Sequence, residues 1–210
     1  MLQNANAPRK RPGRRPSFDP DVVIAGAMSA FWAKGFEATT TADLEAATGV
    51  DRSTIYNSFG GKTGLYRSSV ATYIERCEAE LFAPLQRGTG GLSDILEFLD
   101  LLAAAFGSGG NPPGCLIVND MAADIDHAAT DRYLRGLQDG LSESMNRAAA
   151  SGETDSAKTD ERSQFLTAAV LGINIVHRNG TTTASPQQLI NGLRAEVQSW
   201  VTPSSASSYR

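Results

Sequence analysis

The sequence predicts an all-α protein, and three observations lead to that prediction. Apolar residues recur every three or four positions over most of the 210 residues, which is the period of an amphipathic helix. Glycines, prolines and capping residues divide these runs into segments of helical length. No segment shows the alternation of apolar and polar residues that a half-buried strand requires. We therefore expect about nine helices and no sheet.

The composition narrows the class of protein. A hydrophobic content of 41% and a charged content of 20% are ordinary for a soluble globular chain. No apolar run approaches the ~20 residues that cross a bilayer, and the polar, basic N-terminus does not resemble a secretory signal. Two cysteines are too few for a disulfide framework. We expect a cytoplasmic protein without a membrane partner.

The formal net charge of −4 conceals an asymmetry along the chain. Residues 1–67 hold nine Lys/Arg against six Asp/Glu, a net charge of +3, whereas residues 68–210 hold ten against seventeen, a net charge of −7. Residues 1–16 contain no acid but five basic residues, together with prolines that oppose a helix. This segment is predicted to be a flexible basic arm, either a solubilising tail or an arm that contacts nucleic acid through Arg14 and Arg15.

Three short helices are predicted directly after the arm. The first is capped by Asp19, begins at Pro20 and stops at Gly35. The second follows the hydroxyls of residues 39–41 and ends at Gly49, with Leu44 and Ala47 facing inward. The third is capped by Asp51 and covers residues 52–59. The inward face of the first helix is expected to hold Ile24, Ala25, Met28, Phe31 and Trp32.

The last two of these helices are joined by a tight turn that contains glycine, which is typical of a helix-turn-helix. In that motif the second helix lies in the major groove of DNA. Ile55 and Phe59 are one turn apart and anchor this helix, so its polar residues face outward. Arginine pairs with guanine, asparagine with adenine, and threonine meets a thymine methyl group. The outward residues are Arg52, Ser53, Thr54, Tyr56 and Asn57. The alternative is a solvated polar face on a structural helix.

These residues resemble a known family. The patterns G-F-x-x-T-T, A-T-G-V and S-T-I-Y-x-x-F-x-x-K-x-x-L, within residues 17–66, are similar to the DNA-binding domain of TetR-type (AcrR-like) transcriptional regulators. The resemblance implies phosphate contacts at Thr41, Tyr56 and Lys62, and base contacts around Arg52, Ser53, Thr54 and Asn57. We also expect Thr40 to contact DNA. Glu45 and Gly61 depart from the family pattern, which has a small residue and a capping residue there.

The rest of the chain continues as helices. A long fourth helix is predicted through Tyr66, Tyr73 and Leu81, and a fifth over residues 92–106. Residues 107–114 form a loop of glycines and prolines. Further helices are expected at residues 115–126, 129–150, 158–177 and 185–201. We therefore divide the chain into an arm (1–16), a DNA-binding domain (17–63), a ligand-binding and dimerisation domain (64–202) and a disordered tail (203–210).

The resemblance implies that the larger domain binds a small-molecule effector of unknown identity and pairs with a second copy. Candidate ligand-binding residues are Tyr73, Phe98, Leu102, Phe106, Cys115, Asn119, Tyr133 and Phe165; ordinary core packing is the alternative for each. The family pairs its last two helices across a two-fold axis. Each of those two helices carries a stripe of apolar or small residues that is suited to such pairing. The alternative is that these stripes pack within one subunit. The stripes are Phe165, Ala169, Gly172 and Val176, and Leu189, Leu193, Val197 and Trp200.

Cys115 follows Pro-Pro-Gly and is expected to open a helix, where the helix dipole favours a reactive thiolate. This leaves open a repressor that senses oxidants or electrophiles, while a small buried residue is the simpler interpretation. The sequence contains two histidines without metal-like spacing and no catalytic fingerprint. We therefore predict no enzyme activity, metal or cofactor. The predicted function is a homodimeric repressor that a small ligand releases from a palindromic operator in double-stranded DNA.

Overall fold

The computed structural model describes residues 18–107, 109–121, 125–180 and 184–202, and the regular structure in these ranges is helical throughout. The predicted all-α fold is therefore confirmed. The basic arm with Arg14 and Arg15, and the tail of residues 203–210, lie outside the described residues. None of the described helices is long and apolar enough to cross a membrane.

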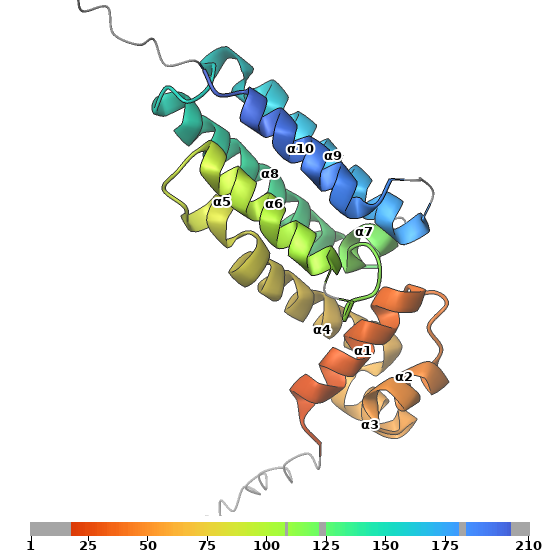
Figure 1. Cartoon of the computed structure of the whole chain (residues 1–210). Coiled ribbons are helices and arrows are strands. Elements are labelled where there is room, and N and C mark those ends of the chain that lie inside the picture. Colours follow the sequence, from red (N-terminus) through yellow and green to blue (C-terminus); the bar gives the residue numbers. More distant parts are fainter. Residues whose placement is uncertain (1–17, 108, 122–124, 181–183, 203–210) are drawn as a thin grey trace, which may run out of the picture.

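Three short helices form one end of the molecule, which we call the head (Figure 1). They are α1 (Pro20–Lys34), α2 (Thr41–Thr48) and α3 (Arg52–Phe59). Each begins where a capping side chain accepts a hydrogen bond from a backbone N–H of its first turn, and these caps are Asp19, Thr40 and Asp51. Gly49 and Gly60 end α2 and α3 with φ values of 71° and 78°, a conformation that favours glycine. Local signals therefore define the limits of the head's helices.

The inward face of α1 differs in part from the prediction. Val23 and Ala27 are buried at 1% and 0% exposure, whereas Ala25 is exposed and Ile24 only half-buried. The predicted inward position of Ala47 on α2 is also wrong, because this residue is exposed. The reason is a close approach of two backbones: a Cβ on Gly26 would lie 2.4 Å from the Ala47 carbonyl oxygen. This contact orients α1 so that Val23 and Ala27 face the core.

The predicted long fourth helix is interrupted. The α-helix α4 (Gly61–Arg76) passes into a π-helical turn, η1 (Cys77–Leu81), and then into an additional short helix, α5 (Ala83–Arg87). In the π-turn the Phe82 N–H donates to the Cys77 carbonyl at 2.7 Å. Pro84 explains the break, because a proline inside a helix clashes with the carbonyl four residues earlier. The α-helix therefore changes into a π-helical turn before Pro84, and a new α-helix, α5, begins at Ala83.

The remaining helices build an elongated bundle above the head (Figure 1). α6 (Leu92–Gly107), α8 (His127–Ala150), α9 (Thr159–Asn179) and α10 (Pro186–Ser199) are the long members, and η3 (Ser156–Lys158) is a short 3-10 turn before α9. α7 (Leu116–Asp120) is shorter than the helix predicted over residues 115–126. α10 packs along α6 and α9, so the last helix closes the bundle.

A partly buried ion pair joins α6 to α8. The Arg147 guanidinium lies 2.9 Å from the Asp94 carboxylate and also donates to the carbonyls of Gly90 and Leu85, at 2.7 and 3.0 Å. A charge is expensive to bury unless it is paired and hydrogen-bonded, and the guanidinium also donates to the Ser144 hydroxyl at 2.9 Å. The pair fixes the loop between α5 and α6 against the bundle.

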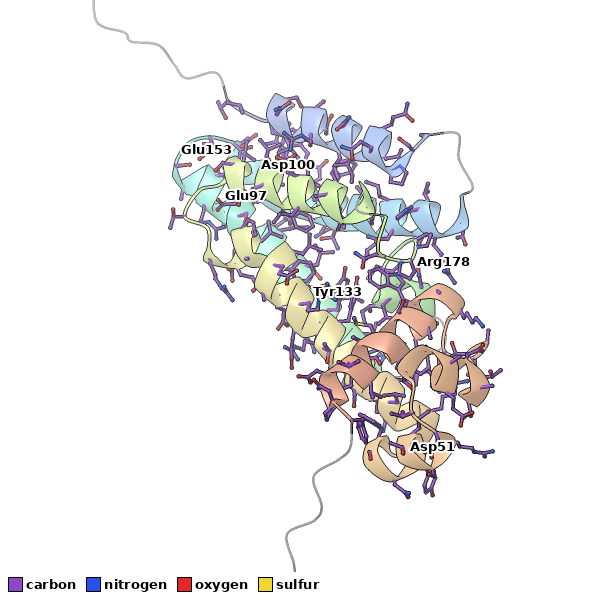
Figure 2. The ribbon with its side chains drawn as sticks, turned by 60° about the horizontal axis from the view of Figure 1, so that its bottom comes forward. Asp51, Glu97, Asp100, Tyr133, Glu153 and Arg178 are labelled. Atoms are coloured by element: carbon purple, nitrogen blue, oxygen red, sulfur yellow. The ribbon has the colours of Figure 1, made fainter. Side chains whose placement is uncertain are left out.

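Two side chains of the bundle hold the end of α1. Asp120, at the end of α7, accepts the Phe36 N–H at 3.1 and 3.2 Å. Arg178, in the last turn of α9, donates to the Ala33 carbonyl at 2.9 Å, and Figure 2 shows it beside the end of α1. Desolvation raises the pKa of Asp120. The head is therefore tied to α7 and α9 by polar contacts to its backbone.

Candidate nucleic-acid interface

The helix α3 exposes a polar face at the free end of the head. Ile55 is its one buried residue, with 2% exposure, whereas Tyr56 is 71% exposed. Arg52, Ser53 and Asn57 are exposed and Thr54 is half-buried. The predicted outward residues thus lie outside the core. Figure 2 shows Asp51, the cap of α3, at the same end of the molecule.

The N-terminus of α3 is held by two carboxylates. Asp51 accepts the Thr54 N–H at 2.7 Å and the Ser53 hydroxyl at 2.9 Å. The bond from the Thr54 backbone is the main reason that the pKa of Asp51 is lowered. Glu45 accepts the Arg52 N–H at 2.7 Å, so this departure from the family pattern has a structural role. Asp51 thus caps α3 and Glu45 ties its first residue to α2, while the Arg52 side chain stays exposed.

A hollow of about 240 Å³ opens beside this face. Thr41 from α2, Arg52 and Tyr56 from α3, and Lys62 from the first turn of α4 all line it. These four residues come from three helices, and all four were predicted to contact DNA. A hydroxyl, a guanidinium, a phenol and an ammonium group around one hollow are donors suited to an anionic oxygen group such as a phosphate.

Lys62 is positioned by the segment after α1. Its Nζ lies 4.5 Å from the centre of the Phe36 ring and donates to the Glu37 carbonyl at 3.3 Å. A cation over an aromatic face is attracted by the ring quadrupole. Gly61 provides no capping side chain for α4, as the sequence indicates. The ammonium group is therefore held at the hollow by Phe36 and Glu37.

Thr40 has a structural task. Its hydroxyl accepts the Asp43 N–H at 3.2 Å and lies 2.8 Å from the Asp43 carboxylate, which in turn accepts the Thr40 N–H. This is a capping box. Lys34 bonds to the same carboxylate at 2.6 Å and is the main cause of the lowered pKa of Asp43. Thr40 thus starts α2, while Thr41 lines the hollow.

Most of the predicted ligand-binding residues are buried in the bundle, but not all of them lie together. Tyr73, Phe98, Leu102, Cys115 and Tyr133 are buried in the bundle. Aromatic rings pack against one another here: the centre of the Tyr133 ring lies 6.4 Å from that of Tyr73 and 5.4 Å from that of Phe82. Phe165 is different, because it is 49% exposed and lies on the outer side of α9, apart from this group.

Hydrogen bonds and one ring contact position Cys115, Asn119 and Phe106 among the candidate ligand-binding residues. The Tyr73 hydroxyl donates to Cys115 Sγ at 3.2 Å, and Cys115 is 2% exposed. Asn119 Nδ2 donates to the Pro113 carbonyl at 3.0 Å, whereas its Oδ1 has no partner among the described residues. The Phe106 ring lies 4.5 Å from the ring of His177, whose Nδ1 accepts the Gly114 N–H at 3.1 Å. Burial lowers the pKa of His177, which keeps this nitrogen free to accept.

A second surface lies on the outer side of the last two helices. A broad, open hollow of about 490 Å³ is lined by residues of both α9 and α10. We call its lining the α9/α10 face. Its residues are Phe165, Ala169, Gly172, Ile173, Val176, Leu189, Gly192, Leu193 and Glu196. Six of the eight predicted dimer residues belong to it.

The other two predicted dimer residues lie elsewhere. Val197 is 0% exposed and is part of the core of its own chain. Trp200 is 8% exposed; its Nε1 donates to Glu196 at 2.9 Å and its ring lies 6.2 Å from that of Phe165. Trp200 thus lies beside Phe165 at one end of the α9/α10 face, whereas Val197 lies in the core.

Sequence reasoning missed the residues that connect the bundle to the head. Asp120 and Arg178 are separated from their partners by 84 and 145 positions, so no local pattern marks them. Trp32, which the sequence places on the inward face of the first helix, also lines a small cleft with residues of α4 and the π-turn. Only its large, amphipathic side chain at the end of a helix could have drawn attention to it.

Comparison with known proteins agrees with this geometry. Residues 23–68 match the family model for bacterial regulatory proteins of the tetR family. The HTH-type transcriptional repressor ComR of Escherichia coli (strain K12) is 30% identical over 194 residues, which cover 86% of this chain and 90% of ComR. The HTH-type transcriptional repressor BdcR of the same organism is 29% identical over 129 residues, covering 56% and 65% of the two chains.

Solved structures share the fold. A cysteine mutant of the TetR family transcriptional regulator CifR, in complex with a 26-base-pair operator DNA, superposes with a TM-score of 0.77 at 23% identity and covers 90% of this chain and 100% of that one. The reduced form of E. coli NemR gives a TM-score of 0.73 at 21% identity, covering 88% and 98%. With a relative such as ComR matched over nearly its whole length, the chain belongs to the tetR family of bacterial regulatory proteins.

Proposed function

We propose that this protein is a homodimeric transcriptional repressor that binds a palindromic operator through α3 and leaves it when a small molecule binds the bundle. Residues 17–63 serve as the DNA-binding domain and residues 64–202 as the domain for ligand binding and dimerisation. ComR and BdcR are named as transcriptional repressors, and the CifR mutant was solved on operator DNA, which supports this role.

The observation that carries the proposal is the hollow formed by Thr41, Arg52, Tyr56 and Lys62. Lys62, Thr41 and Tyr56 would hold the phosphate backbone and thereby fix the register of α3. Arg52, Ser53, Thr54 and Asn57 would then face base edges in the major groove. Two heads in a dimer would read two half-sites about one helical turn, ~34–36 Å, or a multiple of it, apart.

Selection of binding sites from random double-stranded DNA tests this. The protein should enrich an inverted repeat, and wild type should bind it with a salt dependence that reflects its phosphate contacts. Tyr56→Phe removes one hydroxyl and should weaken binding to selected and random DNA alike. Lys62→Ala should do the same and reduce the salt slope by about one. Enrichment of no sequence, or of a site without two-fold symmetry, would contradict the proposal.

A second candidate mechanism uses Cys115 as a sensor of oxidants or electrophiles. The thiol accepts a hydrogen bond from Tyr73 inside the bundle and is 2% exposed, so only a small reagent that enters the core could reach it. Cys115→Ser should leave operator binding intact but abolish release by hydrogen peroxide. Release that is equal in wild type and variant would exclude this mechanism.

A further inference from the structure

A glutamate on α2 is bonded to the first residue of α3, at a position where the family pattern has a small residue. The Glu45 carboxylate accepts the Arg52 N–H at 2.7 Å, across the turn of the helix-turn-helix. The Glu45 carbonyl also accepts the Gly49 N–H at 2.9 Å, the bond that ends α2. Glu45 is half-buried, whereas the Arg52 side chain is exposed and lines the hollow beside α3. One residue thus contacts the backbone at the end of α2 and at the start of α3.

The hydrogen bonds in the first turn of α3 show what the Glu45 side chain contributes. A helix leaves its first N–H groups without partners inside the helix. Asp51 caps α3, but its carboxylate accepts the Thr54 N–H, and its carbonyl accepts the Ile55 N–H at 3.0 Å. Among the described residues, Glu45 is the acceptor for the Arg52 N–H. Without this carboxylate, the first residue of α3 would lose its bond to α2.

Packing fixes α3 mainly from the other side. α3 packs chiefly against α4 and less against α2. In the turn between α2 and α3, the Val50 N–H forms only a long bond of 3.4 Å to the Thr48 hydroxyl. The shorter bond from Arg52 to Glu45 is therefore a main polar restraint on where α3 starts relative to α2.

The Arg52 guanidinium is not engaged by the same carboxylate. In the part of the chain that the structure describes, no ion pair joins Arg52 to an acidic side chain. The donors of the guanidinium therefore remain for a base edge, and two parallel bonds to one guanine need an accurate position. Groups at a binding site must be held to within about 0.5 Å of the productive geometry. Holding the backbone of Arg52 achieves this without occupying its side chain.

We propose that Glu45 is a positioning residue for the reading of DNA. Its carboxylate holds the Arg52 backbone so that the guanidinium meets one base pair, and Glu45 itself does not touch DNA. This inference rests on the proposed function, because it assumes that α3 lies in the major groove. The hydrogen bond on which it depends exists without DNA and is tested separately.

The first measurement uses the full-length protein without DNA. Labelling of arginine with ¹⁵N, with Arg52→Lys to identify the signal, allows hydrogen exchange of the Arg52 N–H to be followed. We expect exchange to be about fivefold faster in Glu45→Ala than in wild type, which corresponds to the loss of one hydrogen bond. Glu45→Gln keeps a carbonyl oxygen and should exchange like wild type. Equal exchange in wild type and Glu45→Ala would overturn the positioning role.

The second measurement is the ratio of two affinities. One is for the operator selected by wild type, and the other is for the same operator changed at the base pair that Arg52→Ala no longer distinguishes. We expect Glu45→Ala to lower this ratio about threefold to tenfold, because a displaced guanidinium loses part of its base contact. Glu45→Gln should restore the ratio. A purely structural role would weaken binding to both DNAs alike, and an unchanged ratio would therefore overturn the proposal.

Two further variants isolate the cause. Glu143→Ala removes an exposed glutamate from α8 in the bundle and should change neither affinity nor ratio. In an Arg52→Ala background, Glu45→Ala should lower the ratio no further, because residues that act through one contact are not additive. Additive losses would overturn the proposal, since they would mean that the carboxylate meets a base itself, as it does when it accepts from a cytosine amino group.

The measurements also separate this inference from the proposed function. A wild-type protein that prefers no DNA sequence would overturn the proposed function, whatever the exchange rate of the Arg52 N–H. A wild-type protein that selects an inverted repeat, together with an unchanged ratio in Glu45→Ala, would overturn the role of Glu45 alone.

Discussion

Two exposed faces of this protein differ in chemistry, although both are surfaces of helices near an end of the chain. The α3 face presents hydroxyls, an amide, a guanidinium and a phenol around a single buried anchor, Ile55. The α9/α10 face presents apolar side chains and two glycines, with one carboxylate, Glu196, among them and with Phe165 at 49% exposure. The first can replace water by another polar, charged surface, whereas the second gains only by meeting another apolar surface. The α3 face is thus chemically suited to a polar, charged partner, and the α9/α10 face to an apolar one.

A substitution on the α9/α10 face should have the largest effect. A Cβ at Gly172 would meet no atom within 4 Å, so Gly172→Arg fits the free subunit but places a charge where a second copy would dock. We expect a monomer by sedimentation with unchanged helical circular dichroism. Operator affinity should fall on the order of 100-fold, because two linked heads gain this much over one.

Gln138→Arg on α8 is the matched control, since it adds the same charge at an exposed position outside the α9/α10 face. It should remain dimeric and bind the operator like wild type. If Gly172→Arg also stays dimeric, the α9/α10 face is not the surface that pairs two copies.

The α3 face is tested by Arg52→Ala. The guanidinium is exposed and lines the hollow, so its removal leaves the fold intact. We expect a loss of about 1–3 kcal/mol on the selected operator and a relaxed preference at one base position. Competition between selected and random DNA measures both.

Arg87→Ala, at the end of α5 in the bundle, removes an equivalent exposed guanidinium far from α3 along the chain and should change neither quantity. Equal losses on selected and random DNA for Arg52→Ala would show that this residue contacts phosphate rather than a base.

The two faces also differ in how far the sequence predicted them. The head follows from short-range signals: the caps Asp19, Thr40 and Asp51 and the stops at Gly49 and Gly60 act within one helical turn. Where a long-range contact intervenes, as Ala47 against Gly26, the predicted inward face of α1 is partly wrong.

The bundle depends more strongly on contacts between distant residues. Its helix lengths follow the apolar period, but Pro84 breaks the fourth helix. Whether Val197 lies inside the subunit or on its outer face is decided by packing against other helices, and the periodicity of one helix cannot show this. The same holds for Asp120 and Arg178, whose backbone partners lie in the head.

A smaller effect concerns the basic arm, which would extend the α3 face by charge alone. Deleting residues 1–15 removes five basic residues. The slope of log affinity against log salt should fall by about 0.9 for each phosphate that no longer has a cationic partner, while thermal unfolding stays unchanged. A tail deletion of residues 203–210 is the control. An unchanged slope after removal of the arm would restrict DNA binding to the head.

The smallest expected effect is on the pH dependence of folding stability. It concerns the contact of His177 with the loop before α7. Burial lowers the pKa of His177 below its ordinary value of 6.5, and its Nδ1 accepts the Gly114 N–H. The unfolded chain therefore takes up a proton at a higher pH than the folded chain. The stabilising contribution is present above pH 6.5 and is lost as pH falls through 6.5 toward the folded pKa. It should be under about 1 kcal/mol, because solvent screens a partly exposed group.

His177→Gln keeps an acceptor but cannot titrate, so its unfolding free energy should decline less than that of wild type between about pH 7 and pH 5. Asp120 contributes with the opposite sign: its raised pKa means that stability from this group is present below pH 3.8 and is lost as pH rises through the folded value. The two groups are thus separable by the direction of their effect, and Asp120→Asn removes the second. If wild type and His177→Gln lose stability in parallel over this range, the link between bundle and head is insensitive to the charge of His177. The pH dependence would then arise from other titratable groups of the chain.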